Sequence, residues 1–173
     1  MQRTPLVAPI VGALLLGLGA TACSTQERNY EIPSALCGTA VSPDLLEPFL
    51  PPGKEISMRE SSLMGGFKKC RVLVDGIQVL SAGIDWREKE QSLTGAAYAA
   101  IGVDPGDKES DDGRYLYSDT GAVGEVVCPN PRRPDRRLFV TALGRGDGET
   151  GEAAMGKFIA AYAEAVGKSG ECT

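Results

Sequence analysis

The segment CRVLVDGIQVL, residues 70–80, places two apolar runs on either side of an Asp-Gly pair. Asp75-Gly76 is a preferred sequence for a two-residue type I′ turn, because both central residues of that turn need a positive φ angle. The segment therefore predicts a tight antiparallel hairpin whose second strand can continue to Trp86. Because parallel strands need long crossovers, tight hairpins favour an antiparallel sheet.

The flanking sequence predicts further short elements. Strands are expected at residues 55–63, 114–117, 122–128 and 137–143. Ser42 can cap a short helix over residues 43–50, and Thr94 can cap another over residues 95–101. The prolines of residues 129–134 predict a loop there, since proline is excluded from the middle of a sheet.

The last predicted element is an amphipathic helix. Its apolar residues recur at helical spacing on one side: Met155, Phe158, Ile159, Tyr162 and Val166. The order of elements predicts an α+β fold, in which an antiparallel sheet of hairpins carries helices on one face. Residues 32–173 are expected to form this single domain.

Two halves of the chain look alike. Each has a helix followed by three strands, and the tetrapeptide AAYA occurs at residues 96–99 and again at residues 160–163. A duplication explains this pattern. The alternative is that AAYA arises readily in an alanine-rich chain.

The N-terminus has the order of a secretory signal. Arg3 gives residues 1–5 a positive charge, residues 6–18 form an apolar run, and small residues precede Cys23. The apolar run is shorter than the roughly 20 residues that a membrane-spanning helix needs. Residues 1–22 are therefore expected to be a signal peptide, and residues 24–31 a polar tether.

Four cysteines follow Cys23, and an even number in an exported chain indicates two disulfides. Three pairings are possible. We expect Cys37 to pair with Cys70 and Cys128 to pair with Cys172, which would fasten both ends of the domain to its strands. A metal site is the alternative, but the chain has no CxxC pair and no histidine.

Ala20-Thr21-Ala22-Cys23 resembles the lipobox of bacterial lipoproteins, although Ala20 stands where that motif usually has Leu. The whole chain resembles actinobacterial membrane-anchored lipoproteins of unknown function, through Cys23, the Cys before the SPDLL helix, the Cys that opens a strand, and the final helix near a last Cys. The resemblance implies cleavage before Cys23, lipidation of its thiol and a location on the extracytoplasmic side of the cell membrane. It implies no activity. The alternative is an ordinary secretory signal with an incidental Cys23.

The charge of the chain restricts its partners. Residues 1–22 contain one basic residue and no acid, so their removal changes the net charge from −5 to −6. Such a charge argues against nucleic acid as a partner, because phosphate binding needs a basic field. It also argues against peripheral adhesion to an anionic membrane, so attachment is expected to depend on the lipid at Cys23.

The absence of histidine excludes Ser-His-Asp and Cys-His catalysis and the usual zinc sites. Residues 146–151 match G-x-G-x-x-G but lack the βαβ context of a dinucleotide site. Residues 145–147 spell RGD, which arises readily by chance. The acidic loop at residues 104–113 does not have the spacing of an EF-hand. Asp85 and Glu88 are a conceivable glycosidase pair that nothing else in the sequence supports.

An arginine cluster is the preferred interaction surface. Arg132, Arg133, Arg136 and Arg137 could bind an anionic polymer, a phospholipid head group or an acidic partner, or could simply balance nearby acids. Trp86 could be an exposed binding anchor, or part of the core.

These observations predict a non-catalytic binding or interaction module of the cell envelope, without cofactor or metal, whose partner is an unidentified envelope protein or polymer. A carrier of a small apolar or sugar-like ligand, held between the sheet and the final helix, is the alternative. A carboxylate-dependent envelope hydrolase is the third possibility.

Overall fold

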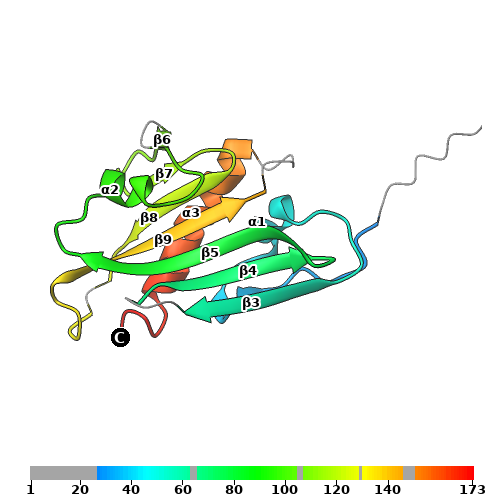
Figure 1. Ribbon diagram of the computed structural model, residues 1–173, viewed down its shortest axis with the longest axis horizontal. Helices are drawn as coiled ribbons and strands as arrows, with labels where there is room; N and C mark the ends of the chain where they lie inside the picture. Colours follow the sequence, from blue (N-terminus) through cyan, green and yellow to red (C-terminus); the bar gives the residue numbers. More distant parts are fainter. Residues whose placement is uncertain (1–26, 63–65, 105–106, 129, 146–150) are drawn as a thin grey trace, which may run out of the picture.

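A computed structural model describes residues 27–62, 66–104, 107–128, 130–145 and 151–173 of the chain (Figure 1). Its helical elements are α1 (Pro43–Leu46), the 3-10 helix η1 (Glu47–Phe49), α2 (Leu93–Tyr98) and α3 (Gly151–Gly167). Its strands are β1 (Ala35–Leu36), β2 (Thr39–Ala40), β3 (Ile56–Ser62), β4 (Lys68–Val74), β5 (Ile77–Glu88), β6 (Lys108–Glu109), β7 (Tyr115–Tyr117), β8 (Gly121–Val126) and β9 (Arg136–Gly144). The predicted α+β class is confirmed.

Seven strands form one antiparallel sheet in the order β3-β4-β5-β9-β8-β7-β6, and β1 and β2 form a small separate sheet. The long strands β5 and β9 pair at the centre, from Leu80 opposite Gly144 to Glu88 opposite Arg136. β5 ends the meander β3-β4-β5 and β9 ends the meander β6-β7-β8-β9, so two hairpin units meet at the middle of the sheet (Figure 1).

The hairpin predicted from residues 70–80 joins β4 and β5. Asp75 and Gly76 have φ angles of 50° and 79°, as a type I′ turn requires. The Asp75 carboxylate accepts hydrogen bonds from the main-chain N–H groups of Lys54 (2.9 Å) and Glu55 (3.0 Å). The turn residue therefore also holds the segment that leads into β3.

The apolar stripe of α3 is buried as predicted. Its five members pack with the α1 and η1 region and with one face of the sheet in the main core. The rings of Phe49 and Phe158 lie with centroids 5.2 Å apart, and Tyr162 stacks on Phe158 at 5.7 Å. Burial of these large side chains contributes most of the stability of this layer.

Helix α2 is the exception to the expected packing of helices on one face. Its residues Ala96 and Ala97 form a second small core with Leu116, Val123 and Phe139, whose side chains point away from α3. In Figure 1, α2 lies in front of the sheet and α3 behind it. The cap is Ser92 rather than the predicted Thr94, because the Ser92 hydroxyl accepts a hydrogen bond of 3.0 Å from the Gly95 N–H.

The two halves agree in their strands and differ in their helices. The order β3-β4-β5 is mirrored by β7-β8-β9 across the centre of the sheet, but α1 and α2 lie on opposite faces. The two AAYA segments also differ, since Tyr98 is 78 % exposed whereas Tyr162 is 1 % exposed. The repeat of AAYA therefore does not reflect a repeated environment.

Both predicted disulfides are present. Cys37–Cys70 joins the β1–β2 turn to β4, and Cys128–Cys172 joins the end of β8 to the C-terminal tail. Every residue of both core clusters lies between Tyr30 and Cys172. The chain from Ser24 to Thr173 therefore carries its own core.

The predicted tether contacts the domain before residue 32. Arg28 donates a hydrogen bond to the Leu50 carbonyl (2.6 Å), and Asn29 N–H donates to the Gly53 carbonyl (2.8 Å). Cys23 lies outside the described residues. No helix in the described part of the chain is long and apolar enough to cross a membrane.

Candidate functional site

The structure divides the predicted arginine cluster. Arg132 and Arg133 lie on the β8–β9 loop and Arg136 begins β9, and all three are exposed. Arg137 follows in β9 and is half-buried, with its side chain on the opposite face of the sheet. The four guanidinium groups therefore do not form a single surface.

Trp86 belongs to the core and not to the surface. It is 3 % exposed, and the Arg133 guanidinium lies 5.0 Å from the centre of its ring. Such a contact is a cation–π interaction, which stabilises the loop against the sheet. The alternative that Trp86 is a core residue is thus the correct one.

Acidic residues already engage two of the arginines. Arg136 forms an ion pair of 2.8 Å with Glu88 on the neighbouring strand. Arg137 pairs with Glu125 and donates a hydrogen bond of 2.7 Å to the Gln91 carbonyl. These contacts favour the alternative that much of the cluster balances nearby acids.

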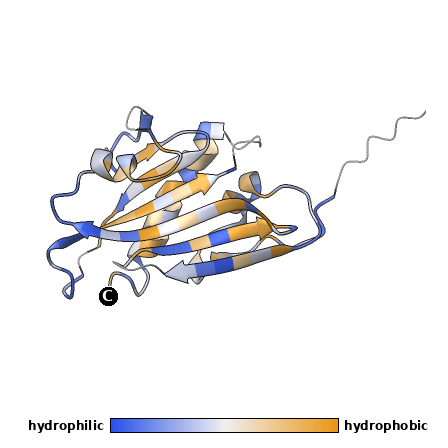
Figure 2. Cartoon of the chain, viewed as in Figure 1, coloured by the Kyte–Doolittle hydropathy of each residue, from blue (hydrophilic) through white to orange (hydrophobic). Residues whose placement is uncertain are grey.

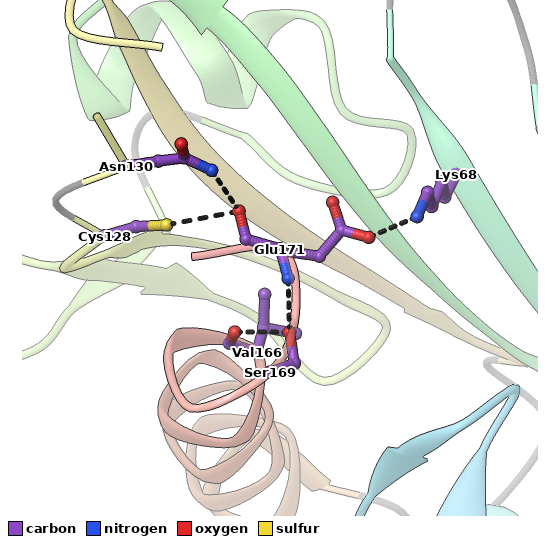
Figure 3. Close-up of polar contacts among 6 residues, drawn as sticks. All are labelled: Lys68, Cys128, Asn130, Val166, Ser169 and Glu171. Atoms are coloured by element: carbon purple, nitrogen blue, oxygen red, sulfur yellow. Dashed lines mark hydrogen bonds and ion pairs between the residues drawn. The ribbon is translucent and has the colours of Figure 1, made fainter. Parts of the chain in front are cut away.

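The β8–β9 loop and the C-terminal tail line a shallow hollow of about 540 Å³. Figure 3 shows how the tail is held: Asn130 and Lys68 both contact Glu171, one at its main-chain carbonyl and the other at its carboxylate. The Ser169 hydroxyl accepts from the Glu171 N–H (3.2 Å) and donates to the Val166 carbonyl (2.7 Å). The hollow therefore has walls fixed by hydrogen bonds and by the Cys128–Cys172 disulfide.

A second site is an open groove of about 940 Å³ between α3 and the β7–β8 edge, in the region between the sheet and the final helix where the alternative of a small-ligand carrier would hold its ligand. We call it the α3 groove. Its helix wall consists of small residues at helical spacing: Gly156, Ala160, Ala163 and Gly167, with Ala161 beside them. Its sheet wall consists of Tyr115, Tyr117, Val126 and Val127. The small residues leave a hollow alongside a helix that is otherwise packed tightly on the sheet.

Gly156 is required by this arrangement. A Cβ at Gly156 would lie 2.7 Å from the Tyr117 ring, so the ring contacts the helix backbone directly. The spacing of the small residues on α3 was the one signal of the α3 groove in the sequence, and it does not distinguish a hollow from close packing.

The rim of the α3 groove is charged. Hydrogen bonds from Ser110 and Arg114 lower the pKa of Asp112, and the hydrogen bond from Lys168 lowers the pKa of Glu164. Burial raises the pKa of the Tyr115 phenol. The two acids lie beside the cations Arg114 and Lys168, so the rim offers hydrogen bonds and charges of both signs.

The other candidate motifs do not assemble into a site. Asp85 pairs with Arg87 and Glu88 with Arg136, and residues three apart on a strand lie on opposite faces of the sheet, so Asp85 and Glu88 do not converge. In the acidic loop, Asp107 accepts from the Asp104 N–H and Asp112 from Arg114. The described residues contain no group of side chains suited to a metal ion. Residues 146–150, which hold most of the glycine-rich and RGD motifs, lie outside the described residues.

Comparison of the chain with protein-family models, with curated proteins and with solved structures gave no match. No similarity to a protein of known activity therefore bears on its function.

Proposed function

We propose that this chain is a lipoprotein, anchored through Cys23 on the extracytoplasmic face of the cell membrane, whose domain is a non-catalytic binding module of the cell envelope. The observation that carries the proposal is the α3 groove. It offers a hollow of about 940 Å³ with an aromatic wall and a charged rim. Hollows of this size are where proteins usually hold ligands or segments of a partner.

The location rests on two further observations. The sequence before Cys23 has the features of an exported, lipid-modified chain. The two disulfides are of the kind that persists in oxidising compartments outside the cytoplasm. Two or three acyl chains on Cys23 would hold the domain firmly at a membrane.

The openness of the α3 groove favours an extended segment of a larger envelope molecule over an enclosed small ligand. A carrier of a small sugar-like ligand is the second candidate, and the tyrosines of the sheet wall support it. A hydrolase has the least support, because Asp85 and Glu88 lie on opposite faces of the sheet.

Site-specific photo-crosslinking in native cells tests the binding module, because it captures a partner whose identity is not yet established. A photoreactive phenylalanine is placed at Ala161, in the α3 groove, or at Ala153, which is exposed on the same helix outside the groove. We expect discrete adducts from position 161 only. Equal labelling from both positions, or none from either, contradicts the proposal. A stoichiometric extra mass in native mass spectrometry of Ser24–Thr173 would instead identify a small-ligand carrier.

A further inference from the structure

The face of the sheet opposite α3 is open over β3, β4 and β5. No described helix covers this part, because α2 packs only against the β7–β9 side. In Figures 1 and 2 the three strands lie in the foreground with hydrophilic bands on β3 and β4. We call this surface, together with the end of α2, the open face.

Three cations lie on the open face. Arg59 and Arg71 are directly opposite each other on β3 and β4, and Lys69 lies two residues before Arg71 on the same side. None of the three forms an ion pair in the described part of the chain. Like charges directly opposite each other on neighbouring strands destabilise a sheet. The stability of the fold therefore does not account for the Arg59–Arg71 pair, whereas binding of an anionic partner would.

Acids on β3, β5 and β8 do not neutralise these cations. Glu60 alternates to the other face of β3. Asp85 is on the same face but pairs with Arg87 at 2.6 Å, and Glu125 pairs with Arg137. Charges are screened over about 8 Å at physiological salt, so a partner at this surface experiences the local positive charge rather than the net charge of −5.

Two exposed apolar side chains accompany the cations. Tyr98 ends α2 with 78 % of its surface exposed, and Ile101 follows with 74 % exposed. The adjacent Gly102 packs on Leu143, since a Cβ there would lie 2.5 Å from the Leu143 side chain. Leu143 belongs to the same row across the sheet as Arg59, Arg71 and Ser81. The end of α2 therefore lies over the same face of the sheet as the three cations.

We propose that the open face rests on the anionic lipid surface of the membrane. Lys and Arg side chains next to exposed aromatic and aliphatic ones are the combination that binds a membrane interface. Arg59, Lys69 and Arg71 contact the lipid phosphates, and Tyr98 and Ile101 enter the headgroup region, where tyrosine is enriched.

This inference deepens the proposed function and rests on it for the nearness of the membrane. Arg28 is fixed on the domain, so the five residue steps from Cys23 to Arg28 span at most about 18 Å. A lipid on Cys23 would therefore keep the domain close to the bilayer, where a weak second contact sets its orientation. The net charge argued against such a contact, whereas the three cations gathered on the open face favour it.

Flotation of the unlipidated chain Ser24–Thr173 with vesicles tests the open face independently of Cys23. The vesicles contain phosphatidylcholine alone or phosphatidylcholine mixed with phosphatidylglycerol. We expect binding only to the anionic vesicles, weakening as salt is raised. Arg71→Gln and Arg59→Gln should each lower the partition coefficient about fivefold. Tyr98→Ser should also lower the partition coefficient, and this loss should persist at high salt because an apolar contact is not screened. Arg132→Gln, an equal change of charge on the β8–β9 loop, should leave it unchanged.

Three results would overturn the inference. They are a lack of binding to anionic vesicles, an equal loss with Arg132→Gln, and tighter binding to poly-glutamate than to vesicles, which would identify an acidic polypeptide as the partner. Arg→Gln changes at exposed strand positions preserve the fold, and far-UV circular dichroism checks this. Because the open face lies outside the α3 groove, failure here would leave the crosslinking result at position 161 unaffected.

Discussion

The side-chain amide of Asn130 donates a hydrogen bond of 2.8 Å to the main-chain carbonyl oxygen of Glu171, 41 residues later in the chain (Figure 3). The Asn130 carbonyl oxygen accepts a bond of 2.9 Å from the Arg132 N–H. One buried side chain thus shapes the β8–β9 loop and also holds the C-terminal tail against it. The Cys128–Cys172 disulfide fastens the same two segments.

We expect Asn130→Ala to lower the free energy of unfolding by about 1–3 kcal/mol, because it removes two hydrogen bonds and leaves a buried carbonyl without a donor. Urea unfolding followed by circular dichroism measures the change. Asn29→Ala is the control, since Asn29 is exposed and its bond to Gly53 comes from the main chain, which the substitution keeps. Equal effects of the two changes would contradict a stabilising role for the Asn130 side-chain hydrogen bonds.

Removal of either disulfide should cost about 4 kcal/mol on the chain-entropy model, since the bridges close segments of 33 and 44 residues. The paired variants Cys37→Ala/Cys70→Ala and Cys128→Ala/Cys172→Ala separate the two contributions in urea unfolding. Addition of a reductant to the unaltered protein should lower its stability by more than either paired variant does. Unchanged stability in reductant would count against a structural role for the bridges.

Alkaline pH should destabilise the domain through Tyr162. Burial raises the pKa of the Tyr162 phenol to about 12, against about 10 in the unfolded chain. The unfolded state therefore loses its proton first, and stability that is complete below about pH 10 is lost as pH rises towards about 12, by roughly 2–3 kcal/mol. Tyr162→Phe should flatten this part of the stability profile. Tyr98→Phe, at an exposed position, should leave the slope as it is.

Arg59→Glu should stabilise the isolated domain by about 0.2–1 kcal/mol, because it replaces a like-charge pair with an ion pair across β3 and β4. Ser57→Glu adds a negative charge on the same strand and face, but opposite Leu73, and is the matched control. Urea midpoints at low salt measure the difference. A loss of stability with Arg59→Glu would mean that the two arginines do not repel each other in the folded protein.

Lipidation should depend on Cys23 alone. In native cells fed labelled palmitate, we expect the full chain to incorporate label and Cys23→Ala to abolish the incorporation. The variant Cys37→Ala/Cys70→Ala removes two cysteines of the disulfides and should keep the label. A lack of label in the unaltered chain would favour the ordinary secretory signal, and label that persists in Cys23→Ala would contradict lipidation at Cys23.

Local sequence was sufficient for several elements. Asp75-Gly76 needs positive φ angles that its residue types tolerate, so the hairpin was evident without any distant contact. The apolar stripe of α3 likewise carried its own periodicity, and all five of its members are buried. The two disulfide pairings also agreed with the expectation, from the order of the cysteines along the predicted elements.

Other features depended on distant contacts. Thr94 and Ser92 are both acceptable caps for α2 by residue type, and the structure places the cap at Ser92. The sequence also could not predict which arginines of the cluster form ion pairs. Glu88 and Glu125, which pair with two of them, come from other strands.

The sequence by itself determined the six longer strands, the amphipathic helix and the cysteine framework, because these depend on spacing and on residues close together in the chain. The short strands β1, β2 and β6 were not predicted, and β6 lies in the segment expected to be an acidic loop. Only the tertiary structure decided which surfaces exist. The α3 groove requires α3 to lie against β7 and β8, and the facing of Arg59 and Arg71 requires the register between β3 and β4. Both arise from pairings between separate segments, and no local pattern in the chain specifies them.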